Sequence, residues 1–160
     1  MTMVEEKKLL VESISGHLPE CAFVEKSHLF KRVAKEDLVQ LYGVGMLKHF
    51  EPGEFIVKEG EDGGELFLIE HGTVQVMTQG LKGLVKLAEL TRGAFFGEIA
   101  LLTGNPRTAN VKAMDRVTTI SFAKQDLESI LLRYPKVRKL MQTMMKARAE
   151  AAIDKVQSQP

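Results

Sequence analysis

The residues best suited to chemistry lie in one segment, FGEIALLTGNPRTA (96–109). Arg107 supplies a planar pair of donors that suits two oxygens of one phosphate. Gly97 allows the backbone to approach a ligand, and residues 98–102 can form one helical turn that presents free N–H groups to an anion. Glu98 would repel a phosphate, but its carboxylate would accept strongly from a hydroxyl group. A cation and an acid on one short segment describe a site for a sugar with a cyclic phosphate.

An ordinary ion pair between Glu98 and Arg107 across the turn would explain the same two residues. Such pairs are common on protein surfaces and contribute little to stability. By residue type and spacing alone, the segment therefore supports an anion-site hypothesis, with the ion pair as its alternative.

The bulk composition indicates an ordinary globular domain around this segment. The chain has 160 residues, of which 44% are hydrophobic and 27% are charged, and its formal net charge is +1. This length suffices for one domain with its own core. The near-neutral charge gives no reason to expect nucleic acid or an acidic membrane as a partner, so an anionic ligand must be bound locally.

No pattern predicts a disulfide, a signal peptide or a membrane span. Cys21 is the only cysteine, which excludes an intramolecular disulfide. The first residues, MTMVEEKKLLVES (1–13), are acidic and amphipathic and lack an apolar signal core. No run approaches the ~20 apolar residues that a membrane span requires. We therefore expect a cytoplasmic chain, or a cytoplasmic piece of something larger.

Three zones of hydrophobic pattern surround the segment. Residues 4–47 have helical spacing, and residues 124–154 return to it with a break at Tyr134-Pro135. Between them, short alternating runs separated by glycine turns are typical of an antiparallel sandwich or jelly-roll barrel. The predicted strands are 54–58, 65–70, 73–77, 84–90, 110–114 and 117–122.

These zones predict an α+β fold, an antiparallel β-roll flanked by N-terminal helices and two C-terminal helices. The predicted domain boundaries are 1–27 for an N-terminal helical extension, 28–154 for the main domain and 155–160 for a flexible tail. The tail is expected to be loose because it contributes no core residues.

The segment 96–109 resembles the phosphate-binding cassette of the cyclic-nucleotide-binding domain family, the type found in catabolite activators, protein kinase regulatory subunits and cyclic-nucleotide-gated channels. Residues 50–76 also look like the opening β-roll strands of that family, and the resemblance covers about four-fifths of the chain. One departure is Gly63-Gly64, where the family often has Gly-Asp; as a turn position, it is expected to have little effect on binding. The matching cassette positions are Phe96, Gly97, Glu98, Ile99, Ala100, Leu101, Pro106, Arg107, Thr108 and Ala109.

The resemblance implies a role for individual residues. Arg107 would bind the exocyclic phosphate oxygens and Glu98 the ribose 2′-hydroxyl, while the Ala100 backbone N–H and Thr108 would join the phosphate contact. Thr108 leaves the base open, because threonine at this position serves cGMP-dependent kinases as well as cAMP-preferring channel domains. We expect cAMP, with cGMP as the alternative. The ligand-binding residues expected from the cassette are Gly97, Glu98, Ile99, Ala100, Arg107, Thr108 and Ala109.

Arg148 is a charged residue on the apolar stripe of the last predicted helix, four residues after Met144 and three before Ala151. In one interpretation its stem packs on the helix and its charge reaches solvent. In the other, Arg148 is an eighth ligand-binding residue that closes over the purine as a lid, similar to a closing-helix arginine in a bacterial cyclic-nucleotide-gated channel domain.

Three other functions compete with a cyclic-nucleotide sensor. The histidines are scattered and no HxH, HExxH or GxSxG motif occurs, so we expect no enzyme, no metal site and no cofactor. A transcription factor would need a DNA-binding domain after the long helix, and the sequence stops near residue 160. A non-binding β-roll module for protein contacts remains an alternative.

The predicted mechanism is a ligand-driven conformational switch, with an unidentified effector or a homodimer through the C-terminal helix.

Overall fold

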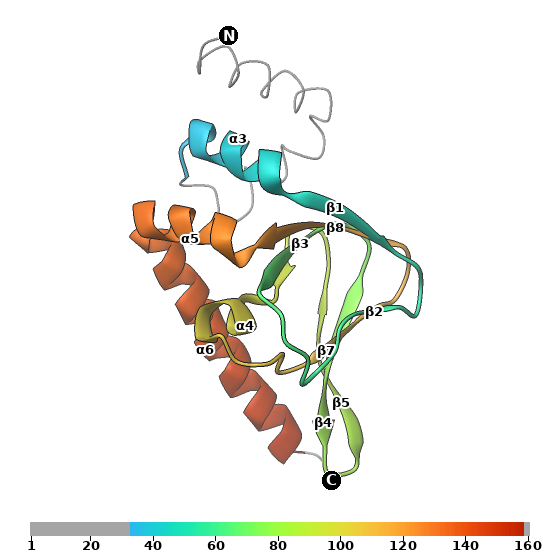
Figure 1. Cartoon of the computed structure of the whole chain (residues 1–160). Coiled ribbons are helices and arrows are strands. Elements are labelled where there is room, and N and C mark those ends of the chain that lie inside the picture. Colours follow the sequence, from blue (N-terminus) through green and yellow to red (C-terminus); the bar gives the residue numbers. More distant parts are fainter. Residues whose placement is uncertain (1–32, 159–160) are drawn as a thin grey trace.

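Two four-stranded antiparallel sheets form the centre of a computed structural model that describes residues 33–158 (Figure 1). One sheet has the order β1-β8-β3-β6 and the other the order β2-β7-β4-β5. The strands are β1 (Met46–Phe50), β2 (Phe55–Val57), β3 (Glu65–His71), β4 (Val74–Gly80), β5 (Gly83–Leu90), β6 (Phe95–Phe96), β7 (Asn110–Ala113) and β8 (Val117–Ala123). The helices are α3 (Lys35–Val44), α4 (Glu98–Thr103), α5 (Lys124–Arg133) and α6 (Pro135–Gln157). This arrangement confirms the predicted α+β class with a β-roll and flanking helices.

Strand β3 separates two hydrophobic clusters and belongs to both. Successive side chains of a strand point to opposite faces. Leu66 and Leu68 accordingly pack with residues of α3, α4, α5 and α6, while Phe67 and Ile69 pack in the interior of the roll. All four are at most 4% exposed, which explains why this run lacks the polar alternation of a strand with one wet face.

Helix α6 runs along one side of the roll, past α4, to the β4–β5 hairpin (Figure 1). It begins at Pro135, a residue suited to the first helical position because its missing N–H has no intrahelical acceptor there. Val137 and Met141 anchor its first half in the core, at 3% and 0% exposure. Near its other end, the Lys155 ammonium donates to the Leu87 carbonyl of β5. The helix is therefore attached to the roll at both ends.

The junction between α5 and α6 is bonded to the start of α3. The Tyr134 hydroxyl donates to the Asp37 carboxylate and accepts from the Ala34 N–H at 3.2 Å. Arg133 Nη1 donates to the same carboxylate at 2.5 Å. The hydrogen bond to Asp37 raises the pKa of Tyr134 above its ordinary value, with a smaller contribution from burial. A movement of α6 about this junction would therefore pull on α3.

Three details of the sequence prediction were wrong. The helical zone ends at Val44, because β1 begins at Met46 and pairs with β8; its exposed side chains, Met46 at 62% and Leu47 at 44%, give no alternating pattern. The two-residue strand β6 was not predicted either. Residues 155–157, expected in a loose tail, are helical.

The other N-terminal predictions lie outside the described residues and stay predictions. They are the extension 1–27, its boundary with the main domain and the helices before residue 33.

Replacing Met141 with alanine is expected to reduce the free energy of unfolding by about 3 kcal/mol, because it leaves a cavity beneath α6. Urea denaturation of the purified chain measures this change. The matched control is Leu132→Ala on α5, where the side chain is 78% exposed and the expected loss is below about 0.5 kcal/mol. Equal losses in the two variants would contradict the anchoring role of Met141.

Candidate ligand-binding site

A cavity of about 800 Å³ lies between the inner wall of the roll, the segment around α4, and α6. The volume is within the range of small-molecule sites. The strand side is apolar, with Val57, Val76 and Val111 among its lining residues, and Ala149 and Ala152 of α6 face it. The charged side chains among its lining residues come from the segment 96–109 and from α6. Such a site fits a ligand with an apolar ring and a localised anionic group.

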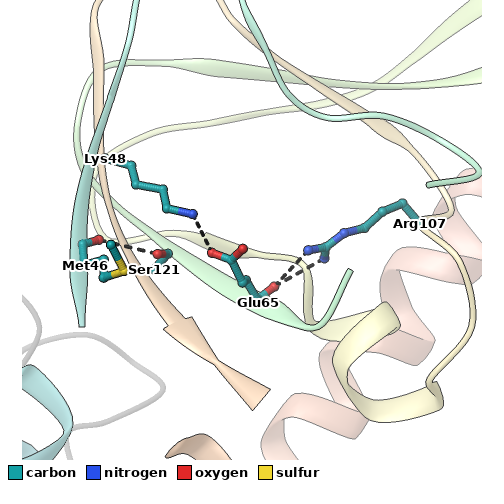
Figure 2. A network of polar contacts seen from close by, with 5 residues as sticks. All are labelled: Met46, Lys48, Glu65, Arg107 and Ser121. Carbon is teal, nitrogen blue, oxygen red and sulfur yellow. Dashed lines mark hydrogen bonds and ion pairs between the residues drawn. The ribbon is translucent and has the colours of Figure 1, made fainter. Parts of the chain in front are cut away.

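Arg107 is a buried cation in this wall, with 7% of its surface exposed. Its Nη1 donates to the carbonyls of Glu65 and Gly97, both at 3.3 Å, and its Nη2 donates to the Glu65 carbonyl at 3.2 Å (Figure 2). A guanidinium has five N–H groups, so these three bonds leave two for a ligand. Burial lowers the pKa of Arg107, and the nearby carboxylates of Glu65 and Glu98 oppose that shift.

Two glycines make room for this guanidinium. Gly97 has φ of +97°, and a Cβ there would lie 2.5 Å from the Glu65 carbonyl oxygen and 2.8 Å from Arg107 Nη1. A Cβ on Gly63 would lie 2.5 Å from Arg107 Nε. Gly97 was predicted to allow the approach of a ligand. In the structure, a glycine is needed at this position because Arg107 packs there against β3. The departure from the family's Gly-Asp falls on Gly64, whose Cβ would make only ordinary contact with Lys124, so the expectation that it has little effect on binding stays a prediction.

Backbone bonds fix the end of the segment that carries Arg107. The Arg107 N–H donates to the Glu61 carbonyl, and the Arg107 carbonyl accepts from the Gly60 N–H, both at 2.8 Å. The Thr78 hydroxyl of β4 donates to the Glu59 carboxylate at 2.5 Å and lies 3.3 Å from the carbonyl of Thr108. The arginine therefore projects from a backbone that is bonded to the loop at Gly60 and Glu61 and lies close to β4.

Glu98 starts α4 and is 1% exposed. Its Oε1 accepts from Arg148 Nη1 of α6 at 2.7 Å, and the Arg148 guanidinium lies 5.1 Å from the centre of the Phe95 ring. The simple Glu98–Arg107 pair considered from the sequence was therefore wrong, because each residue has another partner. Arg148 does not extend freely into solvent either, since 29% of its side chain is exposed and its charge is paired.

The structure brings together every residue that the sequence predicted for the site. Ile99 and Ala100 lie in α4, whose first amides have no intrahelical acceptor. Thr108 and Ala109 continue toward β7, and Arg148 closes the opposite side from α6. The predicted residues that line the cavity are Gly97, Glu98, Ile99, Ala100, Arg107, Thr108, Ala109 and Arg148.

Sequence reasoning missed Gly63 and Glu65, which hold Arg107 from a loop and strand more than 40 residues away. The glycine pair at 63–64 was the available signal, but the pattern did not say which side chain it had to accommodate. Glu65 accepts from Arg107 through its backbone carbonyl, which every residue type has, so this contact left no signal in the sequence.

Across residues 33–158, no group of three histidine, cysteine, aspartate or glutamate side chains could hold a metal ion. In the same range, no helix is long and apolar enough to cross a membrane.

The sequence profile of the family described as "Cyclic nucleotide-binding domain" matches residues 47–134, more than half of the chain. The chain therefore belongs to the cyclic nucleotide-binding domain family. Cyclic nucleotide-gated channel beta-3 of Mus musculus is 38% identical over 123 residues, which is 75% of this chain and 18% of the channel. The chain thus spans less than a fifth of the length of the curated relatives that it matches.

Solved structures agree with this assignment. The catabolite activator protein of Thermus thermophilus has a TM-score of 0.68 and 26% identity, over 78% of this chain and 59% of that one. The regulatory subunit of a cAMP-independent protein kinase A from Trypanosoma brucei has a TM-score of 0.70 and 25% identity, over 76% of this chain and 45% of that one. Both the family and the β-roll fold expected from the sequence are confirmed.

Replacing Gly63 with alanine is expected to displace the Arg107 guanidinium and to lower the free energy of unfolding by about 2 kcal/mol, the usual cost of overpacking. Urea denaturation measures the loss. Gly64→Ala is the matched control, because its Cβ would make only ordinary contact with Lys124 at 3.4 Å. If both variants were equally stable, the close packing of Gly63 against Arg107 would not constrain the site.

Proposed function

We propose that this chain is a regulatory sensor domain that binds a cyclic nucleotide, most favourably cAMP, and converts binding into a movement of its helices. The observation that carries the proposal is the buried, incompletely bonded Arg107 guanidinium in the wall of an otherwise largely apolar cavity. A regulatory rather than catalytic role agrees with relatives named as gated channels and a kinase regulatory subunit. As a reader of an intracellular messenger, the chain would act in the cytoplasm.

Arg107 would bind the exocyclic oxygens of the cyclic phosphate. Its hydrogen bonds within residues 33–158 all go to backbone carbonyls, which orient the guanidinium without cancelling its charge. Burial removes competing water from the cation, so a desolvated phosphate gains a stronger interaction than it would at the surface. In the proposed contact, the Ala100 N–H in the first turn of α4 and the adjacent Thr108 would complete the phosphate site.

Glu98 would accept a hydrogen bond from the ribose 2′-hydroxyl. A carboxylate has two oxygens, and Arg148 is bonded to Oε1, so Oε2 is available for this contact. The same ion pair reduces the repulsion between Glu98 and a bound phosphate. Arg148 would then hold α6 over the ligand, with Ala149 and Ala152 against the base. Gly97, Ile99 and Ala109 would shape the cassette around the sugar phosphate.

The preference for cAMP is an inference from the apolar wall around the base. Leu87, Ala88 and Leu90 of β5 and the alanines of α6 offer hydrophobic contact rather than partners for the polar edge of guanine. Thr108 is the cavity residue that would favour cGMP instead, because its hydroxyl could accept from the guanine amino group. A cGMP-selective sensor is therefore the alternative within the same site.

The contacts of α6 support a switch that reaches the N-terminal side. α6 bears Arg148 beside the ligand site, and Tyr134 at its start is bonded to Asp37 and Ala34 near the start of α3. Closure of α6 on the ligand would therefore change the position of α3. The effector that reads this change would be an attached domain, another protein or a second copy docked through α6.

A non-binding β-roll module is the remaining alternative, and one relative is itself named as cAMP-independent. A thermal-shift screen with cAMP, cGMP and cyclic dinucleotides separates these outcomes. A cAMP sensor is stabilised most by cAMP, because a ligand that binds the native state raises Tm. The absence of stabilisation by all of them would overturn the proposed function.

Replacing Arg107 with alanine is expected to weaken cAMP binding by about 3 kcal/mol, roughly a hundredfold, because the phosphate loses a buried charged partner. Isothermal calorimetry measures the affinity. Arg116→Ala is the matched control, since this arginine side chain is 80% exposed and does not line the cavity. Wild-type affinity in the Arg107 variant would show that the ligand is bound elsewhere.

Replacing Arg148 with alanine is expected to speed cAMP dissociation about tenfold, because α6 loses its bond to the cassette. Stopped-flow displacement of a fluorescent cAMP analogue gives the rate. Arg138→Ala, an exposed position on the same helix, should leave the rate unchanged. A normal rate for the Arg148 variant would exclude Arg148 from ligand retention.

A further inference from the structure

Glu65, the first residue of β3, is bonded to two different cations (Figure 2). Its backbone carbonyl accepts from Nη1 and Nη2 of Arg107, at 3.3 and 3.2 Å. Its carboxylate accepts from the Lys48 ammonium of β1 at 2.7 Å. One residue thus connects the arginine of the ligand site to a lysine in a strand outside the cassette.

The orientation of the Glu65 carbonyl decides where Arg107 lies, because it accepts two of the three bonds of the guanidinium. Residues 58–64, directly before it, form neither helix nor strand. Backbone bonds to Arg107 hold this loop at Gly60 and Glu61, and the β3 ladder begins at Glu65. A bond to the Glu65 side chain supplies a further restraint at the point where the loop becomes the strand.

Lys48 is well placed to supply this restraint. β1 and β3 both pair with β8, so Lys48 projects from the same sheet as Glu65. The Lys48 ammonium lies 5.7 Å from the centre of the Phe67 ring, and the Arg107 guanidinium lies 5.8 Å from the same centre. Phe67 is itself fixed by stacking on Phe96 at 5.0 Å. Both cations are thus placed against one rigid aromatic ring.

We propose that Lys48 is a positioning residue for the ligand site: it holds the Glu65 carboxylate, and the Glu65 carbonyl then holds Arg107 in the geometry that receives the cyclic phosphate. The inference rests on the proposed function and extends the binding machinery into β1. The side chains of Lys48 and Glu65 are 34% and 40% exposed, and such a pair contributes little to overall stability. The pair instead affects binding, because it sets the position of the Arg107 guanidinium.

A charge exchange tests this role. Calorimetric titration with cAMP compares the wild type with Lys48→Glu, Glu65→Lys and the double variant. Each single exchange places like charges side by side and is expected to weaken affinity about fivefold, while the double variant restores the pair and returns to within about twofold of the wild type.

The Glu65→Lys variant separates positioning from simple attraction. It adds a cation near the phosphate site, so charge attraction alone predicts tighter binding, whereas displacement of Arg107 predicts weaker binding. Tighter binding in this variant, or a double variant no better than Lys48→Glu, would overturn the inference.

Milder variants and a control distinguish positioning from a general structural effect. Lys48→Met keeps the length of the side chain without its charge and should lose about threefold in affinity, while Lys48→Arg should retain it. Lys86→Met is the matched control, because Lys86 also forms a 2.7 Å pair, with Glu89, and does not line the cavity. A fall in Tm that follows the affinity across the Lys48 variants would reduce Lys48 to a structural role and overturn the inference.

A measurement without nucleotide keeps this test independent of the proposed function. The Arg107 Nε–Hε resonance, followed by nuclear magnetic resonance in the ligand-free chain, should shift in Lys48→Glu and return in the double variant. If the wild type bound neither cAMP nor cGMP, the proposed function would fail, and this resonance would still report on Lys48. An unchanged resonance in Lys48→Glu would overturn the positioning role.

Discussion

The burial of the Arg107 guanidinium against backbone carbonyls is the interaction on which the rest of the site depends. Carbonyl oxygens carry only partial charge, so they fix a cation in direction without neutralising it. This arrangement places an oriented positive charge in the wall of a largely apolar cavity. The burial removes water from the guanidinium, which lowers the pKa of Arg107. It also requires that Gly63 and Gly97 have no side chain and that β3 begins beside the cassette.

An ion pair between Glu98 and Arg148 balances the buried acid of the candidate site. Glu98 is almost completely buried, and an unpaired carboxylate in that position would be costly as well as repulsive to a phosphate. Arg148 neutralises it from a different helix, which connects the chemistry of the cassette to the position of α6. The two arginines therefore have different roles, since Arg107 is oriented by carbonyls and Arg148 is paired with an acid.

The sequence predicted the local features of the site well and its long-range supports poorly. Gly97, Glu98 and Arg107 lie within eleven consecutive residues, and the short helix expected over 98–102 is present as α4. The supports of Arg107 come from Gly63 and the backbone of Glu65. A backbone carbonyl leaves no pattern in the sequence, and the glycine pair at 63–64 did not say which side chain it accommodates. Strands with alternating runs were predicted, whereas β1, with an exposed edge, and β6, with two residues, were not.

The length of α6 has a mechanical consequence. A helix of 23 residues is about 35 Å long, and its start is fixed at Tyr134. A rotation of about 10° at that pivot moves Val137 by only about 0.8 Å, but moves Arg148 by about 3.7 Å and the far end by about 6 Å. In the proposed switch, α6 would thus act as a lever. The buried first turn at Val137 would stay nearly in place, while the same rotation would separate Arg148 from Glu98 and Lys155 from Leu87.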